Sequence, residues 1–100
     1  MIKHIVMFKL QDFAEDCSKQ ENILKFKKML EVLPSKISFI KLYEIGINYW
    51  ESERAYDIVL VSGFDTKEDL EAYRIHPDHV KVADFILKVR EQSHVVDYEV

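Results

Sequence analysis

The chain has 100 residues, a formal net charge of −4, and a composition that is 48% hydrophobic and 32% charged. That length suits one domain, and that balance of apolar and charged residues excludes a disordered chain, so we expect a single domain over residues 1–100. The basic residues are scattered and form no stripe, which argues against a nucleic-acid partner. Cys17 is the only cysteine, which rules out a disulfide within the chain and favours a reducing compartment.

The N-terminal residues are not expected to form a signal peptide. Their apolar run is short, is interrupted by His4, and lacks a small-residue cleavage site. No stretch approaches the ~20 apolar residues that a membrane-spanning helix needs. We therefore expect a cytoplasmic protein with no membrane partner.

The first third of the chain predicts a strand and then a helix. Apolar residues fill the strand Ile2–Leu10, and a polar connection follows over residues 11–16. Ser18 and Glu21 have the spacing of a capping box at the start of a helix. Pro34 disfavours helical geometry at the residue before it and is expected to end the helix near there. The apolar residues that recur at helical spacing are Ile23, Phe26, Leu30 and Leu33.

The rest of the chain predicts three further strands and two helices. Strands are expected over Phe39–Ile47 and Ala55–Phe64, with a polar loop between them. Thr66 is placed to cap a second helix, and Pro77 suits the first turn of a third. A last strand is expected over His94–Glu99. The apolar stripe of the third helix is Val82, Phe85, Ile86 and Val89.

This order of elements, βαββααβ, predicts an α+β fold of the ferredoxin-like kind, with all helices on one face of a four-stranded antiparallel sheet. The third expected strand is nevertheless apolar on both faces, with Ile58 and Leu60 on one and Val59 and Val61 on the other. Helices on one face leave the other uncovered. We expect a second copy to cover it, so that two sheets pack into a dimeric α/β barrel. A bound lipid or another protein is the alternative occupant.

Several segments resemble the stress-responsive A/B barrel (Dabb) domain family. They are Lys3–Lys9 at the start, Ser52–Asp57 before the third strand, Ala72–Val80 with its His-Pro-Asp-His-Val run, and Val96–Tyr98 near the end. The resemblance covers nearly the whole chain. It implies a homodimeric α+β barrel with a cleft between the sheet and the helices of each subunit.

The resemblance also implies candidate site residues. One relative, a plant polyketide cyclase, closes a ring by aldol chemistry without a cofactor. Its catalytic Tyr–His pair falls on Tyr73 and His79 of this sequence, and a histidine in its pocket falls on His4.

The residues themselves point to the same cluster. His79 shares the apolar face of the third helix, His4 lies in a strand among apolar neighbours, and Tyr73 lies just before the Pro77 turn. A histidine poised near neutral pH can take a proton from a carbon next to a carbonyl, and a tyrosine hydroxyl can bind the resulting enolate oxygen. We therefore predict Tyr73 and His79 as catalytic residues and His4 as a substrate-binding residue, with no cofactor.

A structural role for the same residues stays open. His76 can cap the third helix, and His4 can bond to His79 or Tyr73 to tie strand to helix. The spacing His76-x-x-His79 with Asp78 lacks a marked third ligand, so no metal site is predicted. Two functions therefore remain. One is a binding or enzyme module for a small hydrophobic carbonyl compound, favoured by an open cleft, and the other is a stress-associated structural protein, favoured by a filled cleft.

Overall fold

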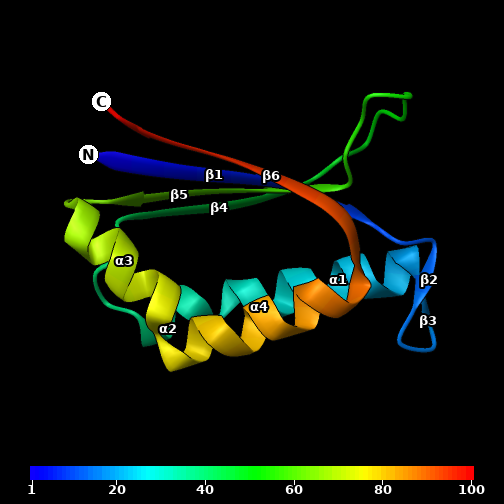
Figure 1. The fold of residues 1–100 in the computed structure, drawn as a ribbon, viewed down its shortest axis with the longest axis horizontal. Helices are drawn as coiled ribbons and strands as arrows, with labels where there is room; N and C mark the ends of the chain where they lie inside the picture. The colour runs from blue at the N-terminus through cyan, green and yellow to red at the C-terminus, as the bar shows by residue number, and fades with distance from the viewer.

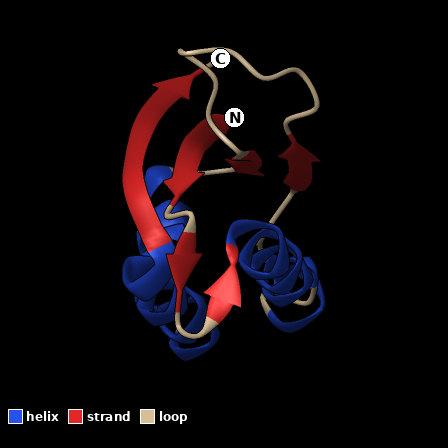
Figure 2. Cartoon of the chain, turned by 90° about the vertical axis from the view of Figure 1, so that its right-hand side faces the viewer, coloured by secondary structure: helices blue, strands red, loops and turns tan.

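The computed structural model describes all residues from Met1 to Val100, arranged in two layers. The main sheet consists of β1 (Ile2–Leu10), β4 (Leu42–Ile47), β5 (Ile58–Phe64) and β6 (Arg90–Glu99). The helices are α1 (Lys19–Glu31), the short α2 (Leu33–Lys36), α3 (Lys67–Ile75) and α4 (Pro77–Val89). All the helices lie on one side of the sheet (Figure 1), and Figure 2 shows the same one-sided arrangement from the end.

The strand order is β4-β5-β1-β6, and every neighbouring pair is antiparallel. The predicted ferredoxin-like α+β fold is therefore confirmed. The register places His4 of β1 between Ser62 of β5 and Asp97 of β6. Because β1 is a central strand, its helix-facing residues lie in the middle of the core.

The hydrophobic core fills the space between the two layers. Side chains alternate along β1, so that Phe8 and Leu10 face the helices and are buried, while Met7 faces away and is exposed. Phe8 packs edge-on against Phe26 of α1, with ring centroids 4.9 Å apart. The apolar stripes that the sequence predicts for the first and last long helices supply the other wall of this core, through Ile23, Phe26, Leu30, Leu33, Val82, Ile86 and Val89.

Three strands begin at other residues than the sequence predicts. β4 begins at Leu42 and not at Phe39, because residues 38–41 turn out of the end of α2, where the Ile40 amide bonds to the Ile37 carbonyl at 3.3 Å. β5 begins at Ile58, and Asp57 before it turns its carboxylate to accept the Leu10 amide at 2.8 Å.

β6 begins at Arg90, four residues earlier than predicted. The chain passes from α4 into β6 without a loop, and Arg90 pairs with Leu10 at a register shift in the ladder. The start of β6 is polar and therefore does not show the alternation that predicts a strand. An edge strand does not need alternating apolar residues where it extends beyond the core.

The expected polar connection after β1 contains a small hairpin. β2 (Phe13–Ala14) pairs with β3 (Cys17–Ser18), and the two residues between them, Glu15 and Asp16, have φ angles of 50° and 59°. Two residues in the left-handed region make the type of tight turn that matches strand twist. Acidic residues in place of Asn-Gly conceal this turn in the sequence.

The first helix ends slightly before the predicted point. α1 ends at Glu31, and Pro34 lies in the first turn of α2. Amides in the first turn of a helix make no hydrogen bond within it, so proline is tolerated there. No helix of the structure combines the length and the apolar character that crossing a membrane requires.

The capping box at the start of α1 is confirmed and gives a test of local stability. The Ser18 hydroxyl accepts from the Glu21 amide at 3.2 Å, and the Glu21 carboxylate accepts from the Ser18 amide at 2.9 Å. Replacing Ser18→Ala removes one of these bonds and is expected to lower the free energy of unfolding by about 1 kcal/mol in urea denaturation. The control Ser38→Ala, at an exposed turn residue, should change it by less than about 0.5 kcal/mol. Equal effects of the two changes would contradict a stabilising cap.

Candidate active site between the sheet and the helices

Tyr73 lies at the centre of the candidate site. It comes from the inner face of α3, is fully buried, and packs its ring against Phe64 with centroids 5.1 Å apart. Its hydroxyl lies 2.9 Å from the hydroxyl of Tyr43, which reaches in from β4. Burial raises the pKa of Tyr73 to about 12, and the hydrogen bond with Tyr43 opposes that rise. Tyr73 therefore keeps its proton at neutral pH and acts as a hydrogen-bond donor.

His79 lies beside Tyr73 because of the break between α3 and α4. The Asp78 amide donates to the His76 ring at 3.1 Å, which confirms His76 as the predicted cap, and Pro77 occupies the first turn of α4. This junction places the end of one helix against the start of the next. The rings of Tyr73 and His79 are consequently stacked at a tilt, with centroids 4.3 Å apart.

The hydrogen bond of His79 fixes which ring nitrogen carries the proton. Nδ1 lies 3.0 Å from the Arg74 carbonyl, and since a carbonyl only accepts, Nδ1 is the donor. Burial lowers the pKa of His79, the bond to the Arg74 carbonyl opposes this, and electrostatic repulsion from neighbouring basic side chains, including Arg74, lowers it further. The ring is therefore neutral at pH 7, and its Nε2 offers a lone pair.

His4 is the third predicted residue, and it too lies at this cluster. It is nearly buried on the helix-facing side of β1, with its ring centroid 6.5 Å from that of Tyr73. Its hydrogen-bond partner is Asp97 of β6, not Tyr73 or His79. The other carboxylate oxygen of Asp97 accepts from Arg74 Nη2 at 2.9 Å. This chain of contacts ties the edge strand, the central strand and α3 together.

The structure thus brings all three predicted residues together and adds Tyr43, Arg74 and Asp97, which sequence reasoning missed. Asp97 lies opposite His4 in the β1–β6 register, so a pairing of first and last strand would have found it. Tyr43 could not be predicted as a site residue, because aromatic residues in strands are common in hydrophobic cores. No group of three or more His, Cys, Asp or Glu side chains is placed to hold a metal ion.

Most of the cluster is shielded from solvent, because Tyr73 is fully buried and His4 is nearly so, while His79 is partly exposed. One pocket of about 370 Å³ borders the cluster, because the ion-paired Arg74 and Asp97 form part of its wall, with Ile2 and Leu70. What the cluster offers chemically is a neutral imidazole and a protonated phenol in contact, one able to accept a proton and the other able to donate to an oxygen anion.

The lowered pKa of His79 predicts a pH dependence of stability. The unfolded chain, with an ordinary histidine pKa of about 6.5, binds a proton before the folded chain does. The contribution of neutral His79 is therefore full above about pH 6.5 and is lost as the pH falls toward the lowered value. Urea unfolding between pH 7.5 and pH 5 should show a shallower loss of stability in His79→Gln than in the wild type. Parallel curves would show that His79 titrates alike in both states.

Comparisons with known proteins agree with this architecture. Residues 2–100 match the stress responsive A/B barrel domain family. The Arabidopsis thaliana stress-response A/B barrel domain-containing protein DABB1 is 34% identical over 98% of this chain, and the alignment spans 46% of DABB1. The chain therefore spans about half the length of that relative.

Two further relatives match most of their own length. The Cannabis sativa olivetolic acid cyclase is 22% identical, over 97% of this chain and 94% of the cyclase. A Bacteroides fragilis crystal structure, described as a dimeric protein of unknown function with a ferredoxin-like fold, superposes with a TM-score of 0.83 at 36% identity, covering 99% of this chain and 95% of that one. The match over residues 2–100, together with the 34% identity to a curated member, shows that this chain belongs to the stress-responsive A/B barrel domain family.

Proposed function

We propose that the chain forms a homodimer through the uncovered face of its sheet, and that each subunit binds a small hydrophobic carbonyl compound and moves a proton on it with Tyr73 and His79. The two parts rest on different observations. The dimer rests on the apolar sheet face. The chemistry rests on one contact, the neutral His79 ring stacked on the Tyr73 ring at 4.3 Å.

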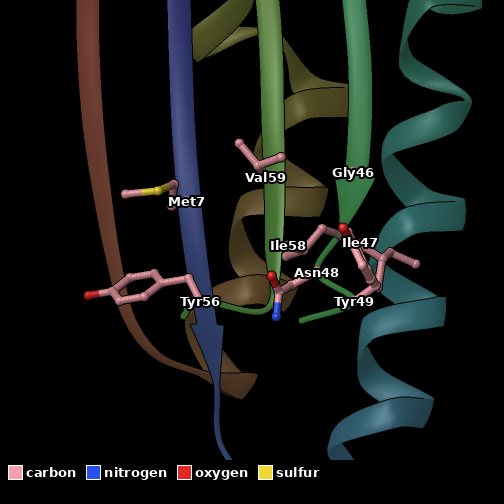
Figure 3. Close-up of a pocket in the computed structure, with 8 residues that line it drawn as sticks. All are labelled: Met7, Gly46, Ile47, Asn48, Tyr49, Tyr56, Ile58 and Val59. Carbon is pink, nitrogen blue, oxygen red and sulfur yellow. The ribbon is translucent and has the colours of Figure 1, made fainter. Parts of the chain in front are cut away.

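The uncovered sheet face is apolar across several strands. Val96, Ile5 and Val61 lie side by side in one row of the ladder, and Met7 and Val59 lie in a neighbouring row. Val96 is 53% exposed and Met7 is 44% exposed. A pocket of about 320 Å³ hollows this face near the end of β4, and Figure 3 shows Met7 and Val59 beside it. An exposed apolar surface of this extent is typical of an interaction site.

A second copy of the chain is the occupant that the observations favour. A symmetric homodimer covers two such faces at once, and each sheet supplies an apolar layer for the other. The Bacteroides fragilis relative, at 36% identity, is itself described as dimeric. Covering the face also offsets the small core of a 100-residue chain.

A matched pair of lysine variants tests the dimer. Sedimentation at micromolar concentration should give twice the chain mass of 11.9 kDa for the wild type. Val96→Lys should give the monomer mass or a much weaker dimer, because dimerisation would bury an unpaired charge. The control Val80→Lys changes a residue on α4 that is 40% exposed on the helix side, and it should remain dimeric. A monomeric wild type, or a Val96→Lys variant as dimeric as the control, would contradict the proposal.

The proposed reaction step is enolisation. His79 Nε2 takes a proton from a carbon next to the carbonyl of the bound compound, and the C–H electron pair becomes a C=C bond. The carbonyl π electrons move to the oxygen, which becomes an enolate that the Tyr73 hydroxyl stabilises by donating a hydrogen bond. With a pKa of about 12, Tyr73 stays protonated throughout. The proton on His79 can then return to carbon or pass to the enolate oxygen.

Entry to the site requires a small rearrangement. Tyr73 is fully buried, and the bordering pocket ends at the ion pair of Arg74 with Asp97. Both members of the pair are more than one-third exposed, so little free energy holds them together. We place the ligand route there. The relative named olivetolic acid cyclase, 22% identical over 97% of this chain, supports an enzyme of the cyclase kind.

The ligand part is tested with acetylacetone, a small β-dicarbonyl. Titration followed by NMR should shift signals of residues around Tyr73 in the wild type. Tyr73→Phe removes one hydroxyl and should weaken binding by about 1–3 kcal/mol without loss of the fold. His79→Asn should abolish any protein-dependent exchange of the C–H proton of the probe with D₂O, measured above the buffer rate. If both variants only lower stability and change neither binding nor exchange, the cluster is structural and a stress-associated structural function replaces the enzyme.

A further inference from the structure

The hydroxyls of Tyr43 and Tyr73 form a buried pair, and Tyr43 has no role in the proposed reaction step. Tyr43 lies on the helix-facing side of β4, and the two oxygens are 2.9 Å apart. The rings meet edge-on with centroids 6.3 Å apart. Each phenol carries one proton, so only one hydroxyl donates across this contact, and the proton of the other is free to point elsewhere.

Burial acts on both hydroxyls of this contact. Burial, and then the proximity of Tyr73, raise the pKa of Tyr43 far above its usual value. The same contact works in the opposite direction on Tyr73, where the bond from Tyr43 lowers the pKa against the rise caused by burial. The 2.9 Å contact allows either hydroxyl to be the donor. When Tyr73 donates its own proton to a ligand oxygen, only Tyr43 can donate across the contact, because each phenol has a single proton.

The hydrogen of the Tyr73 hydroxyl is the second proton of the pair. With its oxygen already accepting from Tyr43, the Tyr73 hydroxyl has its own hydrogen left for one further partner. The His79 ring lies beside the Tyr73 ring, with centroids 4.3 Å apart, so the proposed base and the proposed donor are neighbours. A hydroxyl that accepts one hydrogen bond is a stronger donor in the next, because chained bonds polarise one another.

We propose that Tyr43 is a positioning residue for the site: it donates to the Tyr73 oxygen and so directs and strengthens the hydrogen bond that Tyr73 donates to the enolate oxygen of the ligand. This inference rests on the proposed function and deepens it. Tyr43 touches Tyr73 and not the reacting atoms. Tyr43 affects binding of the enolate more than binding of the neutral compound. The hydrogen bond from Tyr73 becomes stronger as negative charge develops on the ligand oxygen.

The ionisation of bound acetylacetone measures this effect. The enolate of the probe absorbs at longer wavelength than the neutral enol, so its pKa on the protein can be followed by absorbance against pH. The wild type should lower the pKa of the bound probe relative to that in water. Tyr73→Phe should reverse most of this shift, with a loss of roughly tenfold or more in affinity for the enolate. Tyr43→Phe should lose about threefold to tenfold in enolate affinity, with little change for the neutral form.

The control variant is Tyr49→Phe, which removes the same atom from a side chain that is 92% exposed on the loop after β4. It should leave the pKa of the bound probe unchanged. If Tyr43→Phe lowers the melting temperature or weakens both forms of the probe equally, while the pKa of the bound probe stays at the wild-type value, Tyr43 only packs and the inference is overturned. In that case the shift caused by Tyr73→Phe still supports the proposed function. A wild type that does not bind acetylacetone overturns both.

Discussion

The structure depends on one constraint: the sheet is apolar on both faces, and the helices cover only one of them. Side chains along a strand alternate between faces, so a strand such as β5 that carries Ile58, Val59, Leu60 and Val61 in succession must find apolar surroundings on both sides. The helix layer satisfies Ile58 and Leu60, which are buried, while Val59 and Val61 are only partly covered. The proposed homodimer covers this face and gives Val59 and Val61 apolar surroundings on their outer side.

The same constraint shapes the candidate site. The space between sheet and helices is the interior of the subunit, so polar groups placed there need partners. Arg74 supplies two of them, because its carbonyl accepts from His79 and its guanidinium binds Asp97, which holds His4. The hydroxyls of Tyr43 and Tyr73 share one hydrogen bond. The cluster is thus a connected set of contacts from five elements, and because Tyr73 is fully buried, a ligand reaches its hydroxyl only when side chains move.

Several helix boundaries can be predicted from short-range patterns in the sequence. The capping box at Ser18, the cap at His76 and the proline that opens α4 are short-range patterns, and each is found in the structure. The apolar periods of the helices predicted their buried faces for the same reason. The hairpin after β1 was missed, because Glu15 is an uncommon residue for left-handed backbone and no glycine marks the turn. The start of β6 was missed, because its polar residues do not alternate.

The site was predictable only in part. Tyr73 and His79 lie six residues apart, so the helix junction that joins them can be inferred from the chain itself. Asp97 joins the cluster through strand pairing, which makes residues 93 positions apart neighbours, and Tyr43 of β4 joins it across the sheet–helix interface by its contact with Tyr73. Register decides such contacts, and a one-residue slip would turn either side chain to the other face. A pattern of residue types does not fix that register without the structure.

The central claim is that the uncovered face packs against its copy, and intermolecular contacts between methyl groups test it most directly. A dimer prepared from one isotope-labelled and one unlabelled chain, studied by isotope-filtered NOE spectroscopy, reports only contacts between subunits. The account predicts NOEs between subunits for Met7, Val59, Val61 and Val96, and none for the core residue Ile86, which faces the sheet within one subunit. Intermolecular NOEs confined to the helices, or their complete absence, would contradict it.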